Sequence, residues 1–175
     1  MNGPLVGDGP FGTPDIHPGA WIAPGAVVVG RVRIGDRSGV WYGSVLRGDT
    51  EEIVVGELCN IQDQCGLHSD PGEPAVLGDR VSLGHKAMVH GAVVEDGALI
   101  GIGATVLGGA RVGAGALVAA GALVPPGKTV PAGTLWAGVP GKVIRELTDS
   151  DREVFADTPE KYERYARDHR KVTWR

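Results

Sequence analysis

The chain contains 175 residues and has a formal charge of −4, from 17 lysines and arginines against 21 aspartates and glutamates. Its hydrophobic fraction of 42% is enough to build the core of one domain and excludes a disordered chain. Only 5% of the residues are aromatic, no basic stripe is present and no run of about 18 apolar residues occurs, so we expect neither a nucleic-acid partner nor a membrane-spanning segment.

The first fifteen residues are rich in glycine and proline and predict an extended N-terminal segment, 1–15. They carry no positive charge, unlike a secretory signal peptide. The two cysteines, Cys59 and Cys65, are too few for a disulfide scaffold. We therefore expect a cytoplasmic protein with one domain.

From residue 16 onward, a large apolar residue recurs at every sixth position, with three changes of register. These residues are Ile16, Ile22, Val28, Ile34, Val40, Leu46, Val55, Ile61, Leu67, Leu77, Leu83, Val89, Val94, Ile100, Val106, Val112, Val118, Val124, Val130 and Trp136. A small residue often stands four places later, commonly after a glycine, as Ala98 does after Gly97 and Ala104 after Gly103.

A period of six fits neither the 3.6-residue helix nor a plain two-sided strand. It fits short strands that are separated by tight corners and stacked coil on coil, about 4.8 Å apart. The alternative, a β-sandwich, would need strands spaced 8–12 residues apart. The sequence therefore predicts a parallel β-helix of hexapeptide repeats over residues 16–143.

The remaining residues, 144–175, predict a helical segment that packs on the β-helix or on a neighbouring copy. Thr148 and Asp151 have the spacing of a capping box, with aspartate in place of glutamate. Thr158–Pro159 resembles a second helix start. Apolar residues at helical spacing form stripes that would pack on that surface: Val154, Phe155, Tyr162, Tyr165 and Ala166.

Three of the five histidines lie within 23 residues of one another: His68, His85 and His90. If one coil takes three hexads, His68 and His85 are about one coil apart and lie at nearly the same height on the prism. Neutral imidazole is the usual ligand of Zn²⁺, and three protein ligands with one open position form a catalytic site. We therefore predict a metal site. His17 and His169 have no such companions, and we assign them no role.

Several motifs, in this order, resemble the γ-class carbonic anhydrases and their close homologues. They are Arg47-Gly48-Asp49, Asn60-Ile61-Gln62-Asp63, Leu67-His68, Gly84-His85 and His90. The resemblance implies a left-handed β-helix and a homotrimer with three metal sites between subunits. His68 and His90 would come from one chain and His85 from its neighbour, holding Zn²⁺, with Fe²⁺ or Co²⁺ possible.

The same resemblance implies roles for several polar residues. Arg47 and Asp49 would form ion pairs across the subunit interface, with Asp63 as a further partner. Gln62 would help to position the metal-bound water. Gln62 directly follows a core residue, as His68 does in the next hexad, so we expect the two to share a face.

Tyr162 matches a tyrosine of the C-terminal helix in close homologues. It would either reach the site or serve packing alone.

The implied function is the reversible hydration of CO₂ to bicarbonate by a metal-bound hydroxide at the trimer interface, a lyase reaction. One departure concerns the proton relay, because the prototype carries its shuttling glutamate on an extended acidic loop. Here the loop is only 69–76, in which Asp70 and Glu73 are candidate substitutes, so we expect low activity. The alternatives are an acyl-CoA thioesterase or acyltransferase on the same fold, and a scaffold subunit without turnover.

Overall fold

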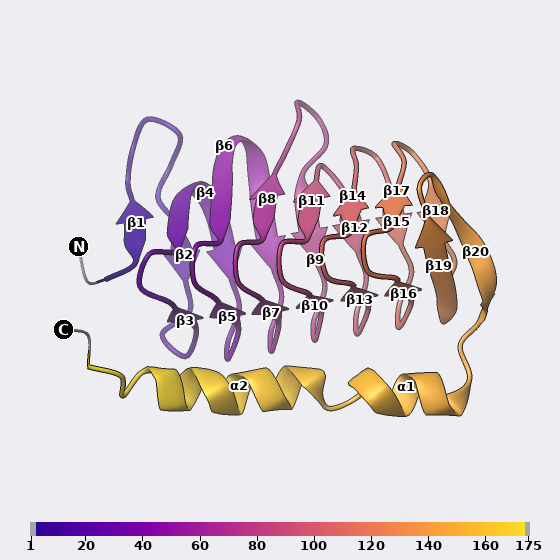
Figure 1. The fold of residues 1–175 in the computed structure, drawn as a ribbon. Coiled ribbons are helices and arrows are strands. Elements are labelled where there is room, and N and C mark those ends of the chain that lie inside the picture. The colour runs from indigo at the N-terminus through magenta and orange to yellow at the C-terminus, as the bar shows by residue number, and fades with distance from the viewer. Residues whose placement is uncertain (1–2, 174–175) are drawn as a thin grey trace.

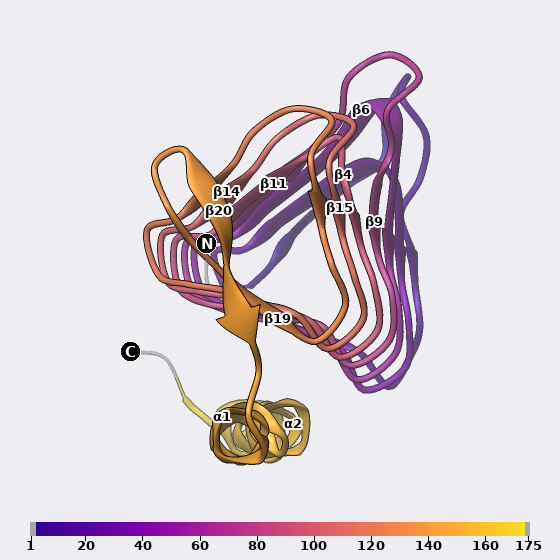
Figure 2. The same ribbon diagram turned by 90° about the vertical axis from the view of Figure 1, so that its right-hand side faces the viewer.

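Short parallel strands wind into a three-faced prism in the computed structural model, which describes residues 3–173 (Figures 1 and 2). Viewed along its axis in Figure 2, the coil has a triangular outline, and the C-terminal helices lie outside it. The solenoid makes about seven turns and is a left-handed parallel β-helix. The predicted fold class is confirmed.

Three stacks of strands form the faces of the prism. The later strands of the first face are β8 (Gly66–His68), β11 (Met88–His90), β14 (Thr105–Val106) and β17 (Leu123–Val124). Those of the second face are β9 (Ala75–Leu77), β12 (Val93–Val94), β15 (Arg111–Val112) and β18 (Thr129–Val130). The third face consists of β3 (Trp21–Ile22), β5 (Gly39–Val40), β7 (Asn60–Ile61), β10 (Ser82–Leu83), β13 (Leu99–Ile100), β16 (Leu117–Val118) and β19 (Thr134–Gly138).

Two long strands, β4 (Val27–Ile34) and β6 (Val45–Val55), bend across the corner between the first and second faces. Their early residues pair with each other on the first face, and their late residues pair on the second. At the bend Gly30 has a φ of +82°, and a Cβ on it would lie 2.5 Å from the carbonyl oxygen of Gly48. This close backbone approach requires glycine.

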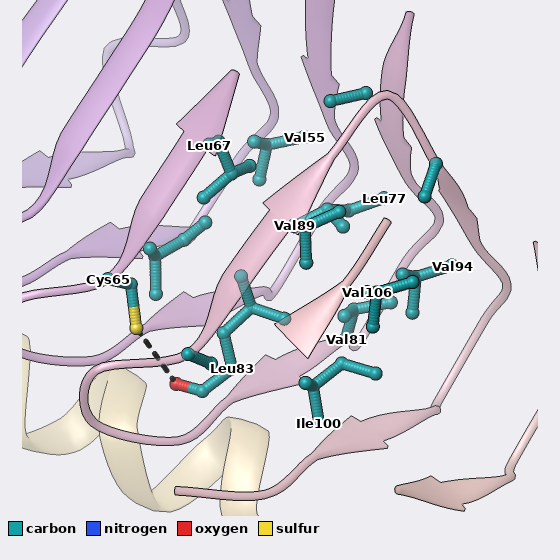
Figure 3. Close-up of a cluster of buried hydrophobic side chains, with 14 of the residues drawn as sticks. Val55, Cys65, Leu67, Leu77, Val81, Leu83, Val89, Val94, Ile100 and Val106 are labelled. Carbon is teal, nitrogen blue, oxygen red and sulfur yellow. Dashed lines mark hydrogen bonds between the residues drawn. The ribbon is translucent and has the colours of Figure 1, made fainter. Parts of the chain in front are cut away.

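The core fills the interior of the prism. Every large apolar residue of the six-residue series is buried there, except Ile16 and Ile22, which are partly buried against it. Figure 3 shows how residues from successive coils, among them Leu67, Leu83 and Val89, stack into one continuous cluster. The small residues are buried as well, including Cys59 and Cys65, which are free thiols.

Both ends of the prism carry additional strands. β1 (Leu5–Gly7) and β2 (Asp15–Ile16) pair with β4, so the segment 1–15 contributes strands rather than only an extended lead. At the other end β20 (Gly141–Glu146) pairs antiparallel with β19, so the boundary expected after residue 143 falls inside a strand. The physical reason is the same at both ends, because an open coil leaves unpaired edges that a further strand satisfies.

Two helices follow the prism, α1 (Asp149–Phe155) and α2 (Thr158–His169). The Thr148–Asp151 capping box is present, as predicted. Helix α1 does not pack on its own prism: it buries no residue, and Val154 is 80% exposed, so packing of this stripe on a neighbouring copy remains a prediction.

Helix α2 packs against the third face of its own chain, where Ala166 meets Trp21 and Trp41. Within residues 3–173, no helix has the length and hydrophobicity needed to cross a membrane.

Candidate metal site

His68 and His90 lie on adjacent coils at the end of the first face. They are paired in register as the last residues of β8 and β11, and their ring centroids are 5.1 Å apart. Each directly follows a buried core residue, so the alternation of a strand turns its side chain outward. The sequence prediction that these two imidazoles meet is therefore consistent with the structure. We call this corner of the prism the His68 edge.

His85 lies at the opposite end of the same face. It stands in the turn between β10 and β11, and the extended stretch from Ala87 to His90 spans about 10 Å at the usual rise of a strand. Among the described residues of one chain, no three His, Cys, Asp or Glu side chains are arranged so that they could hold a metal ion. We call the corner at His85 the His85 edge. A single chain thus presents two partial sites on opposite edges of one face.

Each of the three imidazoles has a carboxylate partner. His68 Nε2 lies 2.9 Å from Asp49 Oδ1, and His90 Nε2 lies 2.9 Å from Asp70 Oδ2. His85 uses its other ring nitrogen, with Nδ1 2.8 Å from Asp63 Oδ2. In each neutral imidazole, the nitrogen that donates to the carboxylate leaves the other nitrogen with a lone pair. That arrangement is typical of histidines that bind metals, so the donor set fits a divalent cation.

Arg47 and Asp49 lie beside His68 on the bent strand β6. The Arg47 guanidinium donates to Asp49 Oδ2 at 2.6 Å, while the other carboxylate oxygen faces His68. The bond from Arg47, followed by that from His68, holds the pKa of the Asp49 carboxyl below its usual range. Within one chain, Asp49 therefore connects Arg47 to His68. The expected pairing across a subunit interface remains a prediction.

Gln62 does not share a face with His68, and this expectation is wrong. Gln62 directly follows β7 on the third face, whereas His68 ends β8 on the first. The six-residue repeat places successive hexads on successive faces, so equivalent positions in consecutive hexads point in different directions. Gln62 instead lies next to Asp63 at the His85 edge. It is 7% exposed, and its Nε2 donates to Asn60 Oδ1 at 3.0 Å.

Tyr162 reaches the His85 edge from helix α2. Its hydroxyl lies 3.4 Å from His85 Nε2, and its ring packs edge-on against Trp41 at a centroid distance of 5.3 Å. Burial, together with the nearby Asp63 carboxylate, raises the pKa of the Tyr162 hydroxyl. In this structure Tyr162 thus both packs against the prism and contacts a candidate ligand.

Comparisons with known proteins show the family of the chain. A family model described as bacterial transferase hexapeptide (six repeats) matches residues 13–48 and 91–126. A Methanocaldococcus jannaschii protein named "Probable carbonic anhydrase" is 46% identical over 81% of this chain and 89% of its own length. The Arabidopsis thaliana protein named gamma carbonic anhydrase 3, mitochondrial, is 44% identical over 90% of this chain, which spans 63% of that relative. The chain belongs to the γ-class carbonic anhydrase family.

The γ-class carbonic anhydrase fold also occurs in proteins that carry other names. A crystal structure of a Bacillus cereus protein described as a candidate acetyltransferase superposes with a TM-score of 0.90. It is 38% identical and covers 92% of this chain and 94% of its own. The fold alone therefore does not select the chemistry.

Two carboxylates of this γ-class chain have structural partners that the sequence did not predict. Asp70 was a candidate proton carrier, but in the structure it contacts His90. Asp63 contacts His85 within the chain, and its expected pairing with Arg47 and Asp49 across a subunit interface remains a prediction. Asp63 and His85 occupy equivalent positions of adjacent coils, but the loop 69–76 lengthens this coil beyond three hexads, so the spacing alone did not reveal their contact.

Proposed function

We propose that the protein hydrates CO₂ reversibly to bicarbonate at three metal sites between the subunits of a homotrimer. His68 and His90 of one subunit would hold the ion together with His85 of the next. The observation that supports this arrangement most strongly is the placement of the two partial sites on opposite edges of one face. Neither edge has three ligands by itself, and a contact between unlike edges supplies the third.

The placement of the edges also favours a closed ring. When the His85 edge of one subunit meets the His68 edge of the next, the contact is head-to-tail and leaves one edge of each kind free. Repeating the same contact generates a ring once the rotation closes. The family resemblance implies that the ring closes at three, with the first face of every subunit turned toward the common axis.

The donor set of three imidazoles suits Zn²⁺ and also accommodates Fe²⁺ or Co²⁺. A cation held there would supply Lewis acidity, which lowers the pKa of a bound water to near neutrality.

The protein's own groups position the reactants. Gln62 donates to Asn60, whose Nδ2 in turn donates to Ser82 Oγ at 2.7 Å, so the amide is fixed before substrate arrives. Gln62 Oε1 is then available to accept a hydrogen bond from the attacking water and so to orient it. On the His68 edge, Asp49 holds the His68 ring, and Arg47 holds Asp49.

Proton removal is the weak step of this proposal. Asp70 is engaged with His90, and the Glu73 carboxylate lies over Gly108 and Gly109, where an added Cβ would collide with it. Neither acid of the short loop is thus placed as a free carrier. Because hydration releases a proton in each cycle, we expect slow turnover that rises with the concentration of external buffer. A rate that is independent of buffer would contradict this explanation.

The first test is metal analysis of the purified protein. We expect about one Zn²⁺ per chain in the wild type and almost none in the His90→Ala variant, because two imidazoles from two chains hold the ion poorly. Undiminished zinc in that variant would overturn the proposed ligand set. Stopped-flow CO₂ hydration by the zinc-loaded and iron-loaded protein then measures activity.

An acyl-CoA thioesterase or acyltransferase is the alternative function, and the similarity to the Bacillus cereus structure favours it. A panel of acyl-CoA thioesters, assayed beside CO₂, separates the two functions. A zinc-loaded protein that is inactive on both substrates would support a scaffold role instead. The cytoplasmic location predicted from the sequence stays a prediction.

A further inference from the structure

Asp63 and His85 occupy equivalent positions on adjacent coils of the prism. Each lies two residues beyond a core position, and the strands before them, β7 and β10, are paired in register. The backbone N–H of Lys86 donates to the carbonyl of Asp63 at 2.9 Å, which fixes the turn that carries His85. The stacking of the two side chains is therefore built into the coil.

The contact between the side chains defines the proton position on His85. Asp63 is a carboxylate and only accepts, so His85 Nδ1, 2.8 Å away, must donate. This leaves Nε2 of the neutral ring as the nitrogen with a lone pair. The Tyr162 hydroxyl, 3.4 Å from Nε2, shows that this nitrogen faces away from Asp63.

We infer that Asp63 is a positioning residue for the metal site: it orients His85 and fixes its Nδ1–H tautomer, so that Nε2 is available to the neighbouring subunit's cation. This inference rests on the proposed function. It adds a contact within the chain to the role that the family resemblance implies for Asp63, that of an ion-pair partner for Arg47 and Asp49 across the subunit interface. Carboxylate partners of this kind typically contribute a factor of about 10–100 to metal affinity.

The chain contains a matched control. At another corner of the prism, His17 Nδ1 lies 3.0 Å from Asp36 Oδ1, with side-chain exposures of 52% and 35%. The Asp63–His85 pair has exposures of 40% for His85 and 33% for Asp63. The Asp36–His17 pair also joins a carboxylate to an imidazole Nδ1, which in addition accepts from the Gly19 N–H, and it plays no part in the proposed site. Asp36→Ala therefore removes the same charge from a comparable surface pair.

The experiment measures zinc affinity by competition with a chromophoric chelator, on variants whose trimeric mass is checked in parallel. We expect Asp63→Ala to bind zinc about 10–100-fold more weakly than the wild type. Asp63→Asn removes the charge but keeps a carbonyl acceptor for Nδ1–H, so we expect it to recover most of the lost affinity. Asp36→Ala should bind as the wild type does.

Each outcome decides the inference. Wild-type affinity in Asp63→Ala would overturn the positioning role while leaving the proposed function intact. A wild type that binds no zinc would overturn both. If Asp63→Ala does not assemble, ¹⁵N NMR of histidine-labelled, zinc-free wild type decides, because the inference requires the Nδ1–H tautomer at His85. Observation of the Nε2–H tautomer there would overturn it.

Discussion

The inward and outward positions of the same strands follow different rules in this protein. Leu67 and His68 are neighbours on β8, yet Leu67 belongs to a buried series that repeats through the prism. His68 stands on the outer surface, where its neighbours along the face differ from coil to coil. At an inward position the fold thus requires only a large apolar residue, because any such residue continues the stack. At an outward position the required residue differs from coil to coil, because each side chain has its own function.

The largest effect that we predict concerns the outward positions at the two edges. His85→Ala and His90→Ala should each lose bound zinc as separate proteins. When the two variants are unfolded, mixed in equal amounts and refolded together, about one quarter of the sites should regain zinc if subunits assemble at random into rings. The regained sites combine an intact His85 edge with an intact His68 edge. Metal content after gel filtration measures the recovery.

The control for this complementation is each variant refolded alone, which should stay without zinc. A site formed within one chain would give no recovery on mixing, because every chain then lacks one ligand. That result would break the assignment of His85 and His90 to different subunits.

A second prediction distinguishes the inward Leu67 from the outward His68 by their effects on stability and on zinc binding. Leu67→Ala removes a side chain that is 1% exposed and leaves a cavity, so the free energy of unfolding should fall by about 2–5 kcal/mol. The folded variant should still bind zinc. His68→Ala should do the reverse, keeping a near-normal melting temperature in the zinc-free form and losing the metal. Calorimetry of the zinc-free proteins and metal analysis together measure both effects, and equal losses of stability would contradict the distinction.

The same distinction explains how much of the molecule could be predicted from its sequence. The series from Ile16 to Trp136 identified the core and the fold, because burial imposes the same demand in every coil. The strands at the two ends were missed, because β1 and β20 satisfy open edges rather than the repeat. Helical periodicity left open which surface the stripe at Val154 would cover, and in one chain Val154 is exposed.

The candidate site was only partly predictable, for a related reason. The spacing argument placed His68 and His85 one coil apart, whereas the strand register pairs His68 with His90, as the family resemblance implied. The direction of Gln62 depended on which face carries which hexad, and the period of six does not specify this. The partners of Asp63 and Asp70 depended on stacking between coils and on the course of a loop. Local sequence contains little of that information.

A third, smaller effect sharpens the description of the His68 edge. Arg47→Ala should weaken zinc binding by about tenfold, because Asp49 would lose the partner that fixes its orientation toward His68. Arg33→Ala, an outward arginine on β4, is the control and should leave the affinity unchanged. Chelator competition measures both variants. If Arg47→Ala bound zinc as tightly as Arg33→Ala, the Arg47–Asp49 pair would have no positioning role.

The smallest predicted effect tests whether inward positions also exclude charge from residues that carry reactive groups. Cys59 and Cys65 lie in the buried small-residue column, and Figure 3 shows the Cys65 thiol directed toward the carbonyl of Leu83. Burial raises the pKa of each thiol to about 12, against an ordinary value of 9.0. At pH 8 a thiol reagent should therefore label neither cysteine in the native protein and both after unfolding.

The pH dependence of stability follows from the same shift in thiol pKa. Because the folded protein keeps both thiols protonated, their contribution to stability is complete below the unfolded pKa near 9. Between about pH 9 and 12 the unfolded chain releases these protons and the folded chain does not, so stability should fall as pH rises. The Cys59→Ala/Cys65→Ala double variant fits the alanine-rich column and should show a shallower fall over this range. If the wild type and the double variant lost stability in parallel, the buried thiols would not be its source, and the inward positions would tolerate ionisable groups more readily than the packing of the prism implies.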